Sequence, residues 1–133
     1  MSGFSPIITR ASTSNEEYLK SLGATHVIDR NLPLSDLPAL VKEITDKPVK
    51  YGYDAISWPD MQNAIYDVVA PGGQLAFVRK PVIDEEKLAK GDKHVARVFA
   101  DVQQPALQDI GKSLYAHLTL LIEAGDIKVS RAS

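Results

Sequence analysis

The sequence predicts an α/β fold of the doubly wound type, in which helices cover both faces of a parallel sheet of five strands. Short runs rich in β-branched residues alternate along the chain with segments whose apolar residues recur every three or four positions. The chain has 133 residues, of which 44% are hydrophobic, enough for one sizeable core. We find no internal repeat and no low-complexity segment. The prediction is therefore a single domain over residues 1–133.

Composition excludes several classes of protein. The 15 basic and 17 acidic residues give a formal charge of -2, and no block of like charge forms a tail that would bind nucleic acid. The chain has no cysteine, which excludes disulfides and thiolate metal sites. No apolar run reaches membrane-spanning length, and no secretory signal pattern follows Met1. We expect a cytoplasmic protein that binds neither nucleic acid nor a membrane.

The first strand is predicted at Pro6–Ala11, and the hydroxyl-rich sequence STSN follows it directly. Ser14 and Glu17 have the spacing of a capping box, which predicts that a helix begins at this point. Gly23 is the residue expected to end that helix. The second strand is predicted at residues 25–29, THVID.

The same alternation continues through the middle of the chain. Ser35 is predicted to cap a second helix, whose apolar stripe consists of Leu37, Leu40, Val41 and Ile44. The third strand is predicted at residues 53–57, YDAIS. A third helix should begin near Pro59, with an apolar stripe made of Met61, Ala64, Ile65 and Val68. The sequence PGG then ends it, and the fourth strand is predicted at residues 74–78.

The last third of the chain begins with a charged segment, residues 79–94, which predicts a solvated connection with one helical turn. Val95–Val102 is the predicted fifth strand. The last helix should begin near Pro105 and end at Gly125. Its apolar stripe consists of Leu107, Ile110, Leu114, Leu118 and Leu121.

The order and spacing of four stretches point to a family. The stretches are GFSPIITRASTSNEEYLKSLGATHVID, YDAIS, VVAPGGQLAFV and VFADVQQPALQDIGKSLYAHLTLLIEAGDIK. They resemble the nucleotide-binding half of the medium-chain dehydrogenase/reductase superfamily, and within it the zinc-free branch of fungal enoyl reductases and quinone oxidoreductases. The resemblance implies a truncated Rossmann domain. The family's GroES-like substrate domain, and the first strand, glycine-rich turn and first helix of its Rossmann fold, would come before residue 1.

The missing strand leads to a prediction of strand order. Deleting the first strand from the Rossmann order 3-2-1-4-5-6 leaves five strands in the flavodoxin-like order 2-1-3-4-5. The strand at residues 6–11 should then pair directly with the strand at residues 53–57, at the usual spacing of about 4.8 Å. A covering helix is lost together with the strand. We therefore predict an apolar patch on one face of the sheet, and a homodimer or a swapped assembly that covers it.

The turn after the first strand is, by the resemblance, the place that receives the 2′-phosphate of NADP. Its hydroxyl and N–H groups can hold a phosphate, and Arg10 can pair with one. No acidic residue ends the first strand to bind a free ribose 2′-hydroxyl, which favours NADP over NAD. Ser57, at the end of the third strand, would line the ribose and nicotinamide. The predicted cofactor-binding residues are Thr9, Arg10, Ser12, Asn15 and Ser57.

These residues also have structural interpretations. Serine, threonine and asparagine are common in turns and helix caps, and Ser57 could equally cap the third helix while Trp58 covers the edge of the sheet. The three histidines are scattered, so neither zinc nor a catalytic residue is predicted. A receiver domain is excluded, because Ser57 stands where its aspartate is needed. FMN stays open as another cofactor, although the hydroxyl-rich turn lacks the glycine of a flavodoxin loop.

Two functions are compatible with the sequence. The first is a truncated NADP-binding domain with little or no oxidoreductase activity alone, in which cofactor binding is weak or lost because the glycine-rich turn is missing. The complete family passes hydride from NADPH to an activated alkene or a quinone. The second is a stand-alone signalling or regulatory module whose apolar patch contacts a protein partner. A third interpretation is a fragment of a longer enzyme with no role of its own.

Overall fold

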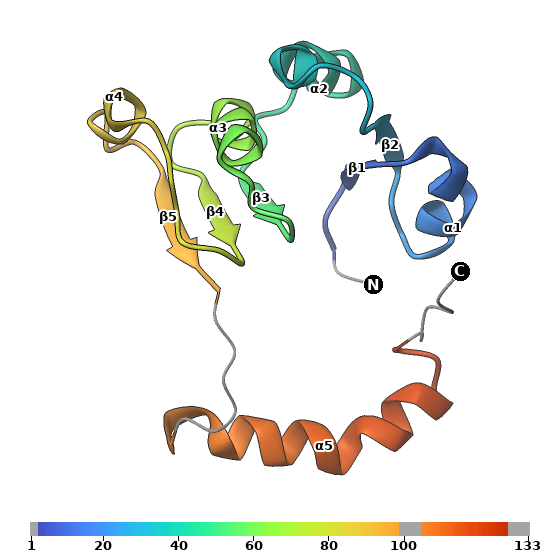
Figure 1. The fold of residues 1–133 in the computed structure, drawn as a ribbon. Helices are drawn as coiled ribbons and strands as arrows, with labels where there is room; N and C mark the ends of the chain where they lie inside the picture. The colour runs from blue at the N-terminus through green and yellow to red at the C-terminus, as the bar shows by residue number, and fades with distance from the viewer. Residues whose placement is uncertain (1–2, 99–104, 128–133) are drawn as a thin grey trace. The chain divides into compact units, whose positions relative to one another are not determined.

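The computed structural model describes residues 3–98 and 105–127, in two units divided after Val98 (Figure 1). The first unit contains five strands: β1 Ile8–Ala11, β2 His26–Asp29, β3 Tyr51–Asp54, β4 Gln74–Phe77 and β5 His94–Arg97. Its helices are α1 Glu16–Ser21, α2 Leu37–Ile44, α3 Pro59–Val68 and α4 Glu85–Leu88. The described part of the second unit contains α5, Gln108–Glu123. Short 3-10 turns, η1 Thr13–Asn15, η2 Leu34–Asp36 and η3 Pro105–Leu107, precede α1, α2 and α5.

The predicted alternation of strands and helices is confirmed, because every predicted element overlaps with one in the structure. The third strand differs most from its prediction, since β3 ends at Asp54 rather than at residue 57. The Asp54 carboxylate accepts the N–H groups of Ile56 and Ser57, and Ser57 has a φ of 57°, so the backbone leaves the strand there. Residues 99–102 of the predicted fifth strand lie outside the described residues.

The predicted single sheet of five strands is not confirmed. Strand β1 pairs with β2, and β4 pairs with both β3 and β5, in each case in parallel. These pairs make one sheet of two strands and one of three, and β1 does not pair with β3 in the described part of the chain. Figure 1 shows the pair β1–β2 and the sheet β3–β4–β5 as separate pieces. The order 2-1-3-4-5 would need β1 to pair with β3.

Two helices pack together beside β1 and β2. A buried cluster made of Ile28, Leu37, Val41 and Ala64 joins β2, α2 and α3, and Ile8 of β1 packs against it. Within the described residues, strands β1 and β3 do not pair. A hollow of about 400 Å³ lies between the two strands.

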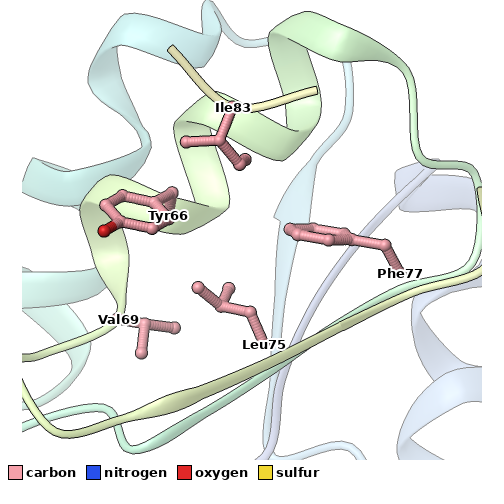
Figure 2. Packing of buried hydrophobic residues seen from close by; sticks show 5 residues of the cluster. All are labelled: Tyr66, Val69, Leu75, Phe77 and Ile83. Carbon is pink, nitrogen blue, oxygen red and sulfur yellow. The ribbon is translucent and has the colours of Figure 1, made fainter. Parts of the chain in front are cut away.

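A second buried cluster joins α3 to the three-stranded sheet. Figure 2 shows Tyr66 of α3, Val69 just after that helix and Ile83 on the side of β4 that carries Leu75 and Phe77. Gly52 of β3 permits the close approach of α3, because a Cβ atom there would lie 3.2 Å from Cγ1 of Ile65. A larger residue would therefore push α3 away from the sheet.

The charged segment 79–94 is held against α3 by polar side chains. Gln62 is 1% exposed. Its amide donates to the carbonyl of Lys80 and accepts the N–H of Val82, at 3.2 and 2.6 Å. Asn63 accepts the N–H of Asp84 at 3.1 Å. The segment contains one helical turn, α4, as the sequence predicts. Its hydrogen bonds to the side-chain amides of Gln62 and Asn63 were not part of that prediction.

Tyr66 makes the attachment of segment 79–94 to α3 depend on pH. Its hydroxyl donates to the carbonyl of Lys87 at 3.0 Å and to Asp92 at 3.3 Å. Burial, and then the nearby carboxylate of Asp92, raise the pKa of the Tyr66 phenol above its ordinary value. Above about pH 10 the unfolded chain therefore holds fewer protons than the folded one, so the free energy of unfolding falls as the pH rises.

Replacing Tyr66 with phenylalanine tests this dependence. We expect the variant to be less stable than the parent protein near neutral pH by about 0.5–1.5 kcal/mol, the worth of a hydrogen bond. The difference should shrink above about pH 10, because only the parent protein has this phenol to ionise. Urea unfolding at a series of pH values measures both quantities. A difference that stays constant into the alkaline range would contradict the assignment to Tyr66.

Candidate functional site

The turn after β1 has hydroxyl groups that cap no helix. The predicted capping box of Ser14 and Glu17 is wrong, because α1 begins at Glu16 and has no side-chain cap. A 3-10 turn precedes the helix, in which the N–H of Asn15 donates to the carbonyl of Ser12 at 3.0 Å. The hydroxyls of Ser12 and Ser14 lie 2.9 Å apart and share a hydrogen bond. Their oxygens therefore form a small polar group at the end of β1.

Arg10 holds the loop after β2 in place. Its Nη2 atom donates to the carbonyl of Leu32 at 2.9 Å and also to the carbonyl of Arg30. Both hydrogen bonds come from one nitrogen of the guanidinium. The whole guanidinium group carries about five N–H donors. The remaining donors are the ones that an anion beside Ser12 could engage. The structure thus gives Arg10 a structural role that the sequence did not suggest.

Thr9 and Ser57 lie away from the turn. Thr9 is in the middle of β1 and lines the hollow between β1 and β3. Ser57 is 2% exposed; its hydroxyl donates to the carbonyl of Asp54 at 2.7 Å and accepts the N–H of Val78 at 3.1 Å. These bonds tie the end of β3 to the end of β4. The hydroxyl therefore does not cap α3, whose N-cap residue is Trp58.

The carboxyl ends of β3 and β4 carry two features that sequence reasoning missed. The guanidinium of Arg79 stacks over the ring of Trp58, 4.3 Å from its centre, and the ring is 58% exposed. Asp54 is buried, and its Oδ2 atom has no hydrogen-bond partner within the described residues. The position of these residues at strand ends was a usable signal, because doubly wound folds bind ligands at that edge.

The described residues offer no place for a metal ion. No group of three or more histidine, aspartate or glutamate side chains lies close enough together in residues 3–98 or 105–127, and the chain has no cysteine. Tetrahedral zinc sites need three or four such ligands. The same parts of the chain contain no helix that is long and apolar enough to span a membrane.

The chain is similar to known dehydrogenases and reductases. The family model described as zinc-binding dehydrogenase matches residues 1–103. No curated protein matches the sequence. A quinone oxidoreductase of Pseudomonas syringae pv. Tomato DC3000 has 25% identity and a TM-score of 0.68, with 95% of this chain and 40% of that chain covered.

Two further solved structures are similar to this chain. Benzyl alcohol dehydrogenase from Acinetobacter calcoaceticus has 28% identity and a TM-score of 0.61, with 86% of this chain and 33% of that chain covered. The CurK enoyl reductase has 25% identity and a TM-score of 0.62, with 93% of this chain and 38% of that chain covered. The chain thus spans well under half of the length of these proteins.

Proposed function

Because the chain belongs to the family of zinc-binding dehydrogenases, we propose that its first unit is part of an NADP-binding domain of the enoyl reductase and quinone oxidoreductase type. The resemblance found in the sequence to medium-chain dehydrogenases and reductases is confirmed at the level of the family. The zinc in the family's name does not fit the described residues of this chain, and no step of the proposal uses a metal.

One observation supports a cofactor role most directly: the free polar group at the end of β1. Within residues 3–98 and 105–127 the hydroxyls of Ser12 and Ser14 bond only to each other, and Arg10, near the end of β1, has guanidinium donors beyond the nitrogen that holds the loop. A phosphate on this turn would accept hydrogen bonds from both hydroxyls and from the cation. β1 ends in Ala11 and has no carboxylate to engage a ribose 2′-hydroxyl, so a 2′-phosphate suits the turn better.

The nicotinamide end of the cofactor has less support in this chain. When bound, NADPH supplies the hydride for reduction of an alkene or quinone. The chain's own contribution is to hold the adenosine phosphate with Ser12, Asn15 and Arg10, while the buried Ser57 hydroxyl maintains the shape of the sheet edge. We therefore propose weak nucleotide binding, and little or no oxidoreductase activity for residues 1–133 alone.

A comparison of NADP with NAD tests this proposal. In an NMR titration of the 133-residue chain, we expect NADP to shift the amide signals of residues 12–15. NADP should bind at least about tenfold more tightly than NAD, since a charge-assisted hydrogen bond contributes about 1.5–3 kcal/mol. Arg10→Lys should retain part of this preference and Arg10→Ala should lose it.

The ratio of the two affinities separates a phosphate contact from a structural role of Arg10. Loss of the loop bonds to Arg30 and Leu32 would weaken both nucleotides equally, whereas loss of a phosphate contact weakens only NADP. Arg30→Ala keeps the Arg30 carbonyl and serves as the matched control. Equal affinity of the parent protein for both nucleotides, or shifts that avoid residues 12–15, would contradict the proposal.

The alternative function, a module that binds another protein, is favoured by a separate observation. The hollow between β1 and β3 is bounded by strand edges that lack a neighbour in the described part of the chain. Such edges pair readily with another polypeptide. This alternative does not depend on cofactor binding.

A further inference from the structure

An aromatic side chain and a cation stack on each other at the carboxyl ends of β3 and β4. These strands pair in parallel, with Asp54 opposite Phe77 at their ends (Figure 1). Trp58 follows the first strand and Arg79 follows the second, and the guanidinium lies over the indole, 4.3 Å from its centre. Both residues are exposed. We call them the Trp58–Arg79 pair, and they lie at the edge of the sheet where doubly wound folds bind ligands.

The guanidinium of Arg79 has unused hydrogen-bond donors. Within residues 3–98 and 105–127 it takes part in no ion pair and no hydrogen bond. An arginine that stacks on a ring uses the face of its planar group, so the N–H donors in that plane stay available. Two of these donors lie parallel and match the two oxygens of a carboxylate. Because the stack already restricts the side chain, an anion that binds there orders it little further.

A buried glutamine fixes the backbone beside both members of the pair. The Nε2 atom of Gln62 donates to the carbonyl of Ser57 at 3.0 Å and to the carbonyl of Lys80 at 3.2 Å. Ser57 comes directly before Trp58, and Lys80 comes directly after Arg79. One amide group thus joins the two segments that carry the stacked side chains. Gln62 is a positioning residue, since at 1% exposure it does not face a ligand itself.

The charges around the Trp58–Arg79 pair favour an anion. Lys80 is exposed and adds a second positive charge next to Arg79 in the sequence. Trp58 is the N-cap residue of α3, so the positive end of a ten-residue helix begins beside the indole. Asp60, in the first turn of α3, is exposed and forms no ion pair with Arg79 in the described part of the chain. Asp54 is buried, and its carboxylate already accepts two backbone N–H groups.

Exposed apolar side chains flank the cation in the sequence. Trp58 is 58% exposed although the guanidinium lies over its ring. Ile56, in the same turn, is 57% exposed, and Val82, three residues after Arg79, is 52% exposed. If these segments only closed the edge of the sheet, burial of such side chains would be favoured. Their exposure suits a ligand that has apolar carbon atoms as well as an anionic group.

We propose that the Trp58–Arg79 pair binds the carboxylate of a small molecule whose remaining part is flat and apolar. The carboxylate accepts two hydrogen bonds from the edge of the guanidinium, and the flat part lies along the exposed indole. Arg79 thereby determines specificity, because it selects an anionic ligand over a neutral one of the same shape. Identifying this ligand as the substrate of a reductase rests on the proposed function, whereas the binding itself does not.

A phosphate group suits the pair less well than a carboxylate on a flat body does. Phosphate can accept hydrogen bonds from the guanidinium, but it leaves the exposed indole and Ile56 in contact with water. The adenosine phosphate of the proposed cofactor has a separate place, the turn after β1, where Arg10 and not Arg79 supplies the cation. The two anion sites therefore use different residues.

A titration with cinnamate, a flat aromatic carboxylate, tests the proposal. Trp58 is the only tryptophan of the 133-residue chain, so its indole N–H gives a single NMR signal. We expect cinnamate to shift this signal and to bind at least about tenfold more tightly than cinnamamide, which has nearly the same shape but no charge. Inorganic phosphate at the same concentration should shift the signal less.

Variants separate the stacked cation from positive charge in general. Arg79→Gln removes the charge and the fork of donors, so cinnamate should then bind no more tightly than cinnamamide. Arg79→Lys keeps the charge without the planar fork and should lie between this variant and the parent protein. Lys80→Gln is the matched control, because it removes a neighbouring charge and keeps the stack. It should change the affinity for cinnamate by less than about threefold, since exposed charges are screened by salt.

Three results would overturn the proposal. One is equal affinity for cinnamate and cinnamamide, which would mean that the carboxylate is not recognised. Another is an Arg79→Gln variant that binds cinnamate as tightly as the parent protein. The third is a shift by inorganic phosphate as large as the shift by cinnamate, which would mean that any anion suffices. The titration contains no nucleotide and follows Trp58, so its outcome is distinguishable from a failure of NADP to bind at residues 12–15.

Discussion

Replacing Phe77 with alanine is expected to lower the free energy of unfolding by about 3–5 kcal/mol. The Phe77 side chain is 0% exposed and lies in the cluster that joins β4 to α3. Removing the ring costs its transfer free energy and also leaves a cavity, because Leu75 and Ile83 can collapse only partly into the space. Domains are stable by about 5–15 kcal/mol in total, so this loss is a large share.

Urea unfolding followed by circular dichroism measures the effect through the transition midpoint. Tyr18→Ala is the matched control, since it also truncates an aromatic residue but at an exposed position of α1. The control should cost less than about 1 kcal/mol. Similar losses for the two variants would mean that the cluster of Figure 2 does not hold α3 on the sheet.

Replacing Asp54 with alanine is the second change with a large expected effect, about 2–4 kcal/mol. The carboxylate accepts the N–H groups of Ile56 and Ser57 at 2.9 and 2.8 Å, and these bonds turn the backbone out of β3. Without them, two N–H groups lose a charged acceptor, and Ser57 loses the contact that supports its left-handed φ of 57°.

Asp54→Asn separates the geometry of this turn from its charge. The amide oxygen can take the place of Oδ1 and keep both hydrogen bonds, while the NH2 group takes the place of Oδ2, which has no partner in the described residues. We expect the asparagine variant to lie between the parent protein and the alanine variant in thermal and urea unfolding. An asparagine variant that is less stable than the alanine variant would show that the two hydrogen bonds are not the main contribution.

Local patterns in the sequence predicted the helices well. The predicted stripe of α2 packs into the core, with Leu37 and Val41 buried. Of the predicted stripe of α3 only Ala64 is buried, and the other buried residues of that helix, Gln62 and Tyr66, lie outside the stripe. The end of β3 was predicted three residues too late, because YDAIS has the composition of a strand throughout. What ends the strand is a pair of hydrogen bonds that the Asp54 carboxylate accepts from the N–H groups of Ile56 and Ser57, and composition does not reveal such bonds.

Contacts between distant residues account for the other differences. Ser14 has the spacing of a cap, yet its hydroxyl bonds to Ser12, because a 3-10 turn comes before the helix. Ser57 was considered as a cap of α3, and its hydroxyl instead links β3 to β4 across 21 residues of sequence, while its contact with a cofactor stays a prediction. Direct pairing of β1 with β3 was inferred from topology alone, and in the described part of the chain the two strands belong to separate sheets.

The central claim about the fold is that β1 and β3 each have one open edge in the described part of the chain. Amide hydrogen exchange of the protein without ligand tests this claim directly. Fast exchange is expected at Ile8, Arg10, Tyr51 and Tyr53, and slower exchange at Thr9, Ala11, Gly52 and Asp54, whose N–H groups face β2 and β4. Equal protection of both sets in a monomeric protein would contradict the claim, because it would mean that the two edges are already paired.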